Sequence, residues 1–540
     1  MNQVQTLFQS AKQAYSSGDF DKAVSLCDQL LARLGQRDDL LNLKALSLLA
    51  ADQTEAAAAA ISAAIKINPK MVGMHLNAAR IFLNLSLNKQ AKRHIKEAIQ
   101  LAPREPTALY QAALLSRECN DYSQAQRILD RCLQVKPDFA LAWHLQGSTL
   151  IDLGRFEEAQ QALEKSIELD PGNARAMSAL LKIRGDTLEA TASVKLLEAI
   201  INSNAPIADR GTATFSLANM YHRERQYDQA FDLFKAANAM AYSVRKFDLN
   251  AWNARIDGLI NATGAAADFV PATGSSGANL LFIVGMPRSG TSLCEQILSA
   301  SQDLMACGEL TAMQNIENAF ARQGLNPYQL LEQDRSPGKA LVNAGEVFLS
   351  ALPKGHAKHR CVIDKAPMNM ERIGMIQQMF PSAKFIYCQR HPLDTILSCY
   401  MQEFNRGLGH TFNLEMLTRV YADYVRLINH WTSIFPEQIF TLNYESLVNN
   451  LESDVLKMTQ FLQLPFQADM LNPHLQDRAV GTASNVQVRK PVNSSSINRW
   501  KNYAGQLDVV IQILQSHDIL DQDLNPTGRY VSVNPLDTTT

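Results

Sequence analysis

Small apolar residues recur at a fixed interval through the first half of the 540-residue chain. One series, spaced 34 residues apart, stands at Ala45, Ala79, Ala113 and Gly147, and a second stands at Ala57, Ala91, Ala125 and Ala159. Prolines keep the same interval at Pro69, Pro103, Pro137 and Pro171. A repeat of this length is typical of a helix–turn–helix unit, in which small residues stand where two helices approach closely. The pattern therefore predicts stacked pairs of helices.

The series has a degenerate start at Ala11 and Ala23, fades after Pro171, and returns at Ala218 and Ala230. It predicts about five to seven helical pairs over residues 3–243, with one irregular unit near 178–208. The pattern resembles the tetratricopeptide repeat, whose arrays form a superhelix with a concave face. That resemblance implies binding of a protein or another macromolecule, and it also allows a homo-oligomer; the alanines themselves are packing residues and carry no chemistry.

Beyond the repeats, the pattern changes to short apolar runs that each end in a loop. Gly, Ser and Ala without periodicity predict a linker over 263–278. The run 280–284 predicts a buried parallel strand, followed by a glycine-bounded loop and a helix, and a second strand–loop–helix follows at 384–398. We therefore expect an α plus α/β protein: a repeat domain over 1–262, the linker, and a P-loop-like α/β domain with a parallel sheet over 279–540.

The first loop has the spacing of a phosphate-binding loop, with Gly285 and Gly290 five residues apart. Thr291 stands where a nucleotide triphosphatase would have its lysine, and the cation within the loop is Arg288. Asp364 could serve as a magnesium ligand, but Lys365 follows at once and would compete with a cation. This combination argues against a kinase or ATPase. Transfer of a sulfuryl group fits better, because that group carries less charge than a phosphoryl group and side chains without a metal can stabilise it.

The motifs Pro-Arg-Ser-Gly-Thr-Ser-Leu and Gln-Arg-His-Pro-Leu-Asp-Thr-Ile-Leu-Ser resemble those of sulfotransferases that use 3′-phosphoadenosine-5′-phosphosulfate (PAPS) and release adenosine 3′,5′-bisphosphate (PAP). The resemblance covers roughly 279–510 and is greatest to the tyrosylprotein sulfotransferases and their bacterial relatives with tetratricopeptide repeats. It implies that the 5′-phosphosulfate is surrounded by Arg288, Ser289, Gly290, Thr291 and Ser292. For the 3′-phosphate it implies Arg390 and Ser398, and for the nucleotide Tyr444. A late segment that closes over the donor would contribute Ser484, Lys490 and Arg499.

The catalytic residues implied by the resemblance are Glu309, Arg288 and Lys365. Lys365 would stabilise the bridging oxygen, and Arg288 would neutralise charge on the sulfuryl group. The family's Cys-Gly-Glu-Glu-Thr stretch stands here as Cys307-Gly308-Glu309-Leu310-Thr311, so Leu310 occupies the position of the base in the protein-tyrosine enzymes. We expect Glu309 to act as the general base. Protein tyrosine, a glycan hydroxyl and a small molecule all remain open as acceptors.

Two other functions compete with a sulfotransferase. A P-loop phosphotransferase would require magnesium-dependent ATP turnover, which the threonine at position 291 disfavours. A non-enzymatic tetratricopeptide scaffold with a degenerate nucleotide-binding domain would account for Leu310. Retention of both Arg390 and Lys365 counts against it, because a site released from catalysis need not keep them.

Composition narrows the remaining choices. The net charge of −2 gives no global attraction to nucleic acid. No apolar run reaches the roughly 18 residues of a membrane span, and the N-terminus lacks the pattern of a secretory signal. The eight cysteines include no Cys-x-x-Cys pair and no zinc-ligand spacing. We therefore expect a cytoplasmic protein with reduced thiols and no metal.

Overall fold

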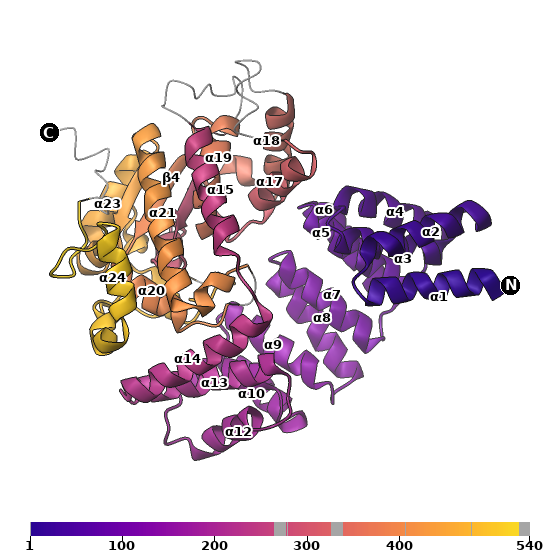
Figure 1. The fold of residues 1–540 in the computed structure, drawn as a ribbon, viewed down its shortest axis with the longest axis horizontal. Coiled ribbons are helices and arrows are strands. Elements are labelled where there is room, and N and C mark those ends of the chain that lie inside the picture. Colours follow the sequence, from indigo (N-terminus) through magenta and orange to yellow (C-terminus); the bar gives the residue numbers. More distant parts are fainter. Residues whose placement is uncertain are drawn as a thin grey trace. The chain divides into compact units, whose positions relative to one another are not determined.

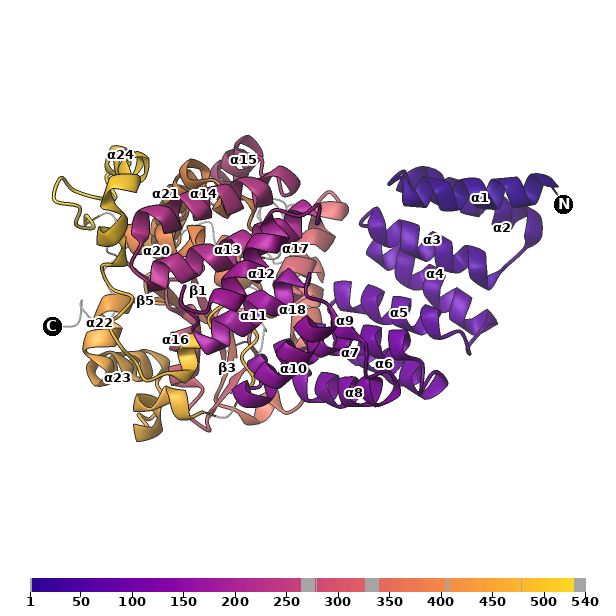
Figure 2. The ribbon, with the colours of Figure 1, turned by 90° about the horizontal axis from the view of Figure 1, so that it is seen from below.

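The structure, a computed structural model, describes residues 2–263, 277, 279–325, 339–404, 407–476 and 478–528. The chain divides into two compact units, Met1–Leu153 and Gly154–Thr540. Figures 1 and 2 show the two views of the ribbon. Apart from Thr263 and Gly277, the predicted linker lies outside the described residues.

The first unit consists of nine helices in its described part. They are α1 (Asn2–Ser16), α2 (Phe20–Leu34), α3 (Asp38–Ala50), α4 (Thr54–Ile67), α5 (Val72–Asn84), α6 (Asn88–Leu101), α7 (Pro106–Glu118), α8 (Tyr122–Val135) and α9 (Ala140–Asp152). Alanines of both series are completely buried between neighbouring helices, as at Ala45, Ala57, Ala79 and Ala91. Their lack of a larger side chain is what lets the helices approach closely, so the periodic pattern correctly predicted this packing.

The second unit begins with more helices of the same kind. They are α10 (Phe156–Leu169), α11 (Ala174–Arg184), α12 (Thr191–Ile201), α13 (Ile207–Arg223), α14 (Tyr227–Val244) and α15 (Leu249–Ala262). In the described residues, fourteen helices, α1 to α14, follow one another over residues 2–244, as many as seven helical pairs would need. The irregular unit is the pair α11–α12, whose helices have only 11 residues each.

A parallel sheet of five strands follows in the described residues. The strands are β1 (Leu280–Gly285), β2 (Leu304–Ala306), β3 (Cys361–Asp364), β4 (Lys384–Gln389) and β5 (Ile439–Asn443), in the order β2-β3-β1-β4-β5. Phe282 is in register with Asp364 on one side and Phe385 on the other. Both faces of β1 are buried, as expected for a parallel strand covered by helices on each side. The predicted fold class is therefore confirmed.

Helices and short 3-10 turns cover the sheet. The helices are α16 (Thr291–Leu298), α17 (Ala312–Arg322), α18 (Lys339–Ala351), α19 (Ile373–Met379), α20 (Pro392–Tyr400), α21 (Leu414–Ile434), α22 (Tyr444–Asn449), α23 (Leu451–Leu462) and α24 (Asp508–Ser516). The 3-10 turns are η3 (His356–Lys358), η4 (Pro367–Arg372), η5 (Gly409–Phe412), η6 (Ala468–Leu471), η7 (Pro473–Leu475), η8 (Gln487–Arg489) and η9 (Arg499–Gln506). Helices α16 and α23 pack on one face of the sheet, and α18 to α21 pack on the other.

The last repeat helices belong to the same core as the sheet. Phe234 of α14 and Trp252 of α15 are buried in one apolar cluster with Phe282 of β1. The indole N–H of Trp252 also donates to the Asp423 carboxylate of α21 at 3.1 Å. Figures 1 and 2 both show α15 close to α21. The two compact units separate at 153/154, and the domain limits at the linker 263–278 stay a prediction.

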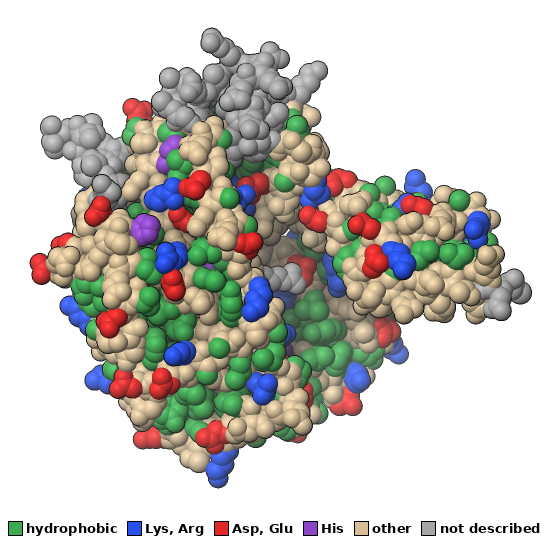
Figure 3. Space-filling model, viewed as in Figure 1, with side chains coloured by type: hydrophobic (Ala, Val, Ile, Leu, Met, Phe, Trp, Pro, Cys, Tyr) green, Lys and Arg blue, Asp and Glu red, His purple; other side chains and the backbone are tan. Residues whose placement is uncertain are grey.

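Charged side chains of both signs are interspersed on the face of the molecule in Figure 3. This agrees with the small net charge of the sequence. Within the described ranges, no helix is both long and apolar enough to cross a bilayer.

The shared core makes a prediction about where the chain can be cut. A fragment starting at Gly154 keeps all of α13 to α15, whereas a fragment starting at Thr263 loses Phe234, Trp252 and Ile256 from the core. Burial of each such side chain is worth about 1.5–3 kcal/mol, so their combined loss approaches the ~5–15 kcal/mol that stabilises a typical domain. We expect fragment 154–540 to unfold in one cooperative thermal transition, and fragment 263–540 to lack one. Near-ultraviolet circular dichroism during heating measures this, and equal melting of both fragments would contradict the shared core.

Candidate active site at the carboxyl edge of the sheet

The loops that follow the five parallel strands all lie at one edge of the sheet. Arg288 follows β1, Glu309 follows β2, Lys365 follows β3, Arg390 follows β4 and Tyr444 follows β5. In open parallel sheets, ligands bind at the carboxyl ends of the strands. The sequence motifs, which are far apart along the chain, are thus brought to one edge.

The loop between β1 and α16 is fixed by two glycines with positive φ. A Cβ on Gly285 (φ 145°) would lie 2.6 Å from the Cys388 carbonyl oxygen, and one on Gly290 (φ 105°) would lie 2.7 Å from the Tyr444 ring. Arg288 also has a positive φ of 70°, which is uncommon outside glycine. The Ser289 hydroxyl is buried and has no hydrogen-bond partner among the residues that the structure describes. A loop of this form suits an anion that accepts hydrogen bonds from the backbone and from Ser289.

The side chain of Arg288 reaches three polar groups from distant segments. Its Nε donates to Ser398 Oγ at 3.1 Å, Nη1 to Ser484 Oγ at 2.5 Å and Nη2 to Gln487 Oε1 at 2.9 Å. The contact with Ser398 is a finding that the motifs did not indicate. It directs Arg288 toward the residues expected around the 3′-phosphate. The action of Arg288 on the sulfuryl group stays a prediction.

Arg390 is buried directly beside this group. Its Nη1 donates to the Arg288 carbonyl oxygen at 3.0 Å, and Nη2 donates to the Ser496 carbonyl oxygen. Its guanidinium carbon lies 4.9 Å from the centre of the Tyr444 ring, a cation–π distance. Arg390 therefore holds together the phosphate loop, the late segment (residues 478–506) and α22.

Three guanidinium groups come close enough to influence one another. Burial, together with the charges of Arg390 and Arg499, lowers the pKa of Arg288 to about 10. Burial and then the charge of Arg390 lower the pKa of Arg499 as well. Positive charges held this close in a partly buried site favour a polyanion. The arrangement therefore fits a nucleotide with more than one phosphate.

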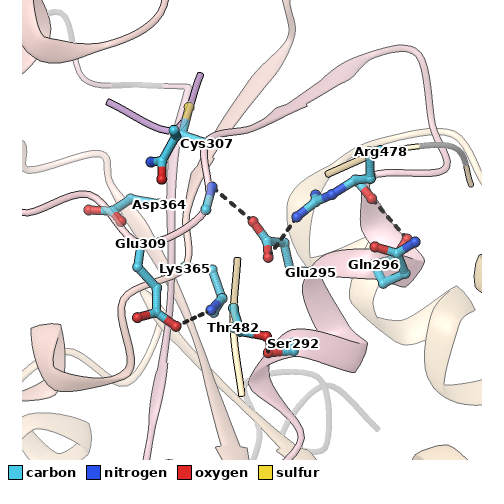
Figure 4. A network of polar contacts seen from close by, with 12 residues as sticks. Ser292, Glu295, Gln296, Cys307, Glu309, Asp364, Lys365, Arg478 and Thr482 are labelled. Atoms are coloured by element: carbon cyan, nitrogen blue, oxygen red, sulfur yellow. Dashed lines mark hydrogen bonds and ion pairs between the residues drawn. The ribbon is translucent and has the colours of Figure 1, made fainter. Parts of the chain in front are cut away.

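A buried lysine and an exposed glutamate form the second part of the site (Figure 4). Lys365 is completely buried, and its Nζ forms an ion pair with Oε1 of Glu309, whose side chain is 52% exposed. The backbone N–H of Lys365 donates to the Gly308 carbonyl oxygen at 2.9 Å. The pair joins the loops after β2 and β3 and leaves the carboxylate accessible to a substrate.

Comparison with known proteins agrees with these features. Residues 281–468 match the model of the sulfotransferase family, and residues 8–72, 106–139 and 140–173 match models of the tetratricopeptide repeat. The chain carries a sulfotransferase-family domain and tetratricopeptide repeats.

Relatives align with only part of this chain. An "Uncharacterized protein" of Aquifex aeolicus is 31% identical over 335 residues, which are 60% of this chain and 44% of that protein. Protein-tyrosine sulfotransferase A of Caenorhabditis elegans is 26% identical over 236 residues, 41% of this chain and 60% of that protein. The match thus spans about half the length of these relatives. The sulfotransferase domain of the Synechococcus PCC 7002 olefin synthase is 20% identical with a TM-score of 0.33, over 44% of this chain and 93% of that one.

Leu310 lies next to Glu309 in the loop after β2. Its side chain packs against the main apolar core, and its N–H donates to Asp364 Oδ1 at 3.2 Å. Asp364 also accepts from Asn369 Nδ2 at 3.0 Å, and burial raises the pKa of its carboxyl to about 7. Asp364 thus orders the loops around the site. In the part of the chain that the structure describes, no cluster of three or more His, Cys, Asp or Glu side chains could hold a metal ion.

The late segment is attached to the sulfotransferase domain by contacts that the motifs did not indicate. Buried Glu295 of α16 accepts from the Gly308 N–H at 3.0 Å and pairs with Arg478 at 2.9 Å. The hydroxyls of Ser292 and Thr482 are 3.3 Å apart (Figure 4). These contacts could not be predicted from the sequence, because Gly308 and Arg478 lie far from Glu295 along the chain.

Asp394 holds the end of the same segment. Its two oxygens accept from the backbone N–H groups of Asn498 and Trp500 at 2.7 and 2.9 Å. The Trp500 ring stacks on His391 at 5.6 Å between centroids. Asp394 belongs to the motif after β4, which could have indicated a role for it. Lys490, by contrast, has an exposed side chain.

The geometry around Gly290 gives a prediction about the phosphate loop. Ala at position 290 would combine a positive φ with a collision against Tyr444, whereas Ala at Gly355 (φ 88°) would meet nothing within 4 Å. Backbone strain alone costs about 1–2 kcal/mol, and overpacking adds about 1–3 kcal/mol. We expect Gly290→Ala to lower the free energy of unfolding by more than Gly355→Ala does, as measured by denaturant titration. Equal losses would show that the Tyr444 ring moves aside freely.

Proposed function

We propose that this protein transfers the sulfuryl group of PAPS to the hydroxyl of an acceptor. The observation that carries the proposal is the buried Lys365, held by Glu309 at the strand end next to the phosphate loop. A phosphotransferase loop would place its lysine at the first turn of the following helix, where this chain has Thr291. Here the lysine comes from the neighbouring strand. The sulfotransferase-family domain supports the same reaction.

The residues present fit PAPS in three respects. The buried hydroxyl of Ser289 has no partner in the described part of the chain, and Gly290 leaves the loop open where a Cβ would collide with Tyr444. Arg288, Arg390 and Arg499 provide positive charge for the phosphates. We assign Arg390 and Arg288, with Ser398 and Ser484, to the 3′-phosphate side. Ser289, Thr291 and Ser292, which open the loop and the helix, are assigned to the 5′-phosphosulfate.

The proposed reaction needs one base and one acid. The Glu309 carboxylate accepts the proton of the acceptor hydroxyl as its oxygen bonds to sulfur. The Lys365 ammonium donates a hydrogen bond to the bridging oxygen while the bond between sulfur and that oxygen breaks. PAPS supplies the sulfuryl group, and PAP leaves with the electron pair of the broken bond. These two side chains and the arginines supply the charge stabilisation in this proposal, which uses no metal.

The acceptor is a hydroxyl compound. The related enzymes named protein-tyrosine sulfotransferases make a tyrosine hydroxyl one candidate, beside glycan and small-molecule hydroxyls. We further propose that the repeat array engages a macromolecular acceptor, since its repeats offer many weak contacts. Transfer of labelled sulfate to separate protein, glycan and metabolite pools tests this choice. Cytoplasmic location and a homo-oligomer remain predictions.

Binding of PAP is the first test of the proposal. We expect low micromolar affinity, and we expect Arg390→Ala to weaken it by roughly 2–4 kcal/mol because a charge-assisted grip on phosphate is lost. Isothermal titration calorimetry of the full chain measures both, and the exposed Arg419→Ala is the control. Because Arg390 also holds two backbone carbonyls, Arg390→Lys is measured as a second variant, with an intermediate loss expected. Unchanged PAP affinity in both Arg390 variants would remove Arg390 from the site, and a native chain that binds no PAP would refute the proposal.

Glu309→Gln tests the base. The amide oxygen of glutamine can still accept from Lys365, so we expect normal folding and normal PAP affinity. We also expect turnover to fall about 10²- to 10⁴-fold, the usual worth of a general base. Single-turnover transfer of labelled sulfate measures this effect, with the exposed Glu346→Gln as a matched control. A loss below about tenfold would assign the base to another group. It would leave the sulfotransferase reaction itself intact.

A further inference from the structure

The late segment over residues 478–506 joins the sulfotransferase site to the repeat helices of the same unit. On one side, Ser484 accepts from Arg288, and Asp394 holds Asn498 and Trp500. On the other side the segment contacts α11 and α13, which belong to the repeats. The repeats are therefore in direct contact with the segment expected to close over the donor.

Helix α11 holds the segment on both sides of Ser484. The Lys182 ammonium donates to the Ala483 carbonyl oxygen at 3.0 Å and to Asn485 Oδ1 at 2.8 Å. Ser484, which lies between these two acceptors, receives Nη1 of Arg288. A lysine of the repeats thus fixes the backbone that presents Ser484.

Helix α13 holds Arg499 through a histidine. Arg499 Nη2 lies 2.8 Å from His222 Nε2, and the Tyr503 hydroxyl lies 2.7 Å from His222 Nδ1. A guanidinium can only donate, so Nε2 must be the acceptor, and the proton of the neutral ring is on Nδ1. Burial, with the charges of Arg499 and Arg223, lowers the pKa of His222 to about 4, which agrees with a neutral ring. His222 therefore donates to Tyr503 and accepts from Arg499 at once.

This contact opposes an electrostatic repulsion. Burial and then the positive charge of Arg390 lower the pKa of Arg499, so the two guanidinium groups repel each other. A flexible arginine beside another cation would turn toward solvent unless an acceptor held it. His222 is that acceptor. Because it is neutral, it holds Arg499 without cancelling the positive charge that a phosphate needs.

We propose that His222 is a positioning residue for the donor site, holding Arg499 beside Arg390 where both face the 3′-phosphate. The inference rests on the proposed function, and it makes the helices α11 and α13 a structural part of the PAPS site. Their contribution differs from the binding of an acceptor. His222 would raise the affinity for the donor because an Arg499 side chain that is already held loses less conformational entropy when it binds phosphate.

The test compares PAP with adenosine 5′-monophosphate, which lacks the 3′-phosphate. His222→Phe keeps a ring of similar size but removes the acceptor, and His222→Gln restores an acceptor. For His222→Phe we expect PAP affinity to fall about tenfold, the worth of one charge-assisted hydrogen bond, while affinity for the monophosphate changes less than about twofold. His222→Gln should recover most of the PAP affinity. Calorimetry on the full chain measures these values, with the exposed His517→Phe as the control.

Outcomes that would overturn the inference are distinct from failure of the proposed function. Equal losses for PAP and the monophosphate would show a merely structural role, and so would unrescued loss in His222→Gln. In an Arg499→Met background, His222→Phe should have no further effect on PAP affinity, and a persisting tenfold loss there would refute positioning through Arg499. If His222→Phe lowers the melting temperature strongly, the single variants Arg499→Met and His222→Gln, each compared with the native chain, still decide whether His222 positions Arg499. A native chain that binds neither nucleotide would refute the proposed function, and the inference with it.

Discussion

Several positive charges have to be held close together at one edge of a sheet, and much of the second unit serves that constraint. Arg288, Arg390 and Arg499 repel one another, yet a polyanionic donor requires them at the same place. The structure holds them with neutral acceptors: serine hydroxyls, backbone carbonyls and a neutral histidine. Carboxylates would be stronger partners, but they would compensate the charge on which anion binding depends. Lys365 is the exception, because its partner Glu309 also has a proposed role in the reaction.

The fold was predictable from local patterns in the sequence. The 34-residue interval predicted the helical pairs because, within the first unit, small residues at equivalent positions are buried where neighbouring helices pack. The apolar run before Gly285 predicted β1 because a parallel strand is buried on both faces. Helix α15 was not predicted, since it lies beyond the periodic pattern and its Trp252 packs against residues far along the chain.

The candidate site was predictable only in part. The strand-end motifs indicated Arg288, Arg390 and Lys365, because loops after parallel strands meet at one edge. Their partners were not predictable, because the contact between Arg288 and Ser398 joins residues 110 positions apart. The role of His222 was even harder to predict from the sequence. It stands in a helix whose sequence pattern reports only packing, and its partners Arg499 and Tyr503 are more than 270 residues away.

The position of the unit boundary has a consequence for how this architecture can vary among descendants of one ancestral gene. Repeats before Gly154 form a compact unit of their own, so whole 34-residue steps can be gained or lost there by duplication or deletion without removing core residues of the sheet. Helices α13 to α15 share their core with the sheet, and α11 and α13 hold the late segment. An insertion among them would displace Lys182 or His222. Array length is therefore an evolvable trait at the amino-terminal end and a fixed one beside the sheet.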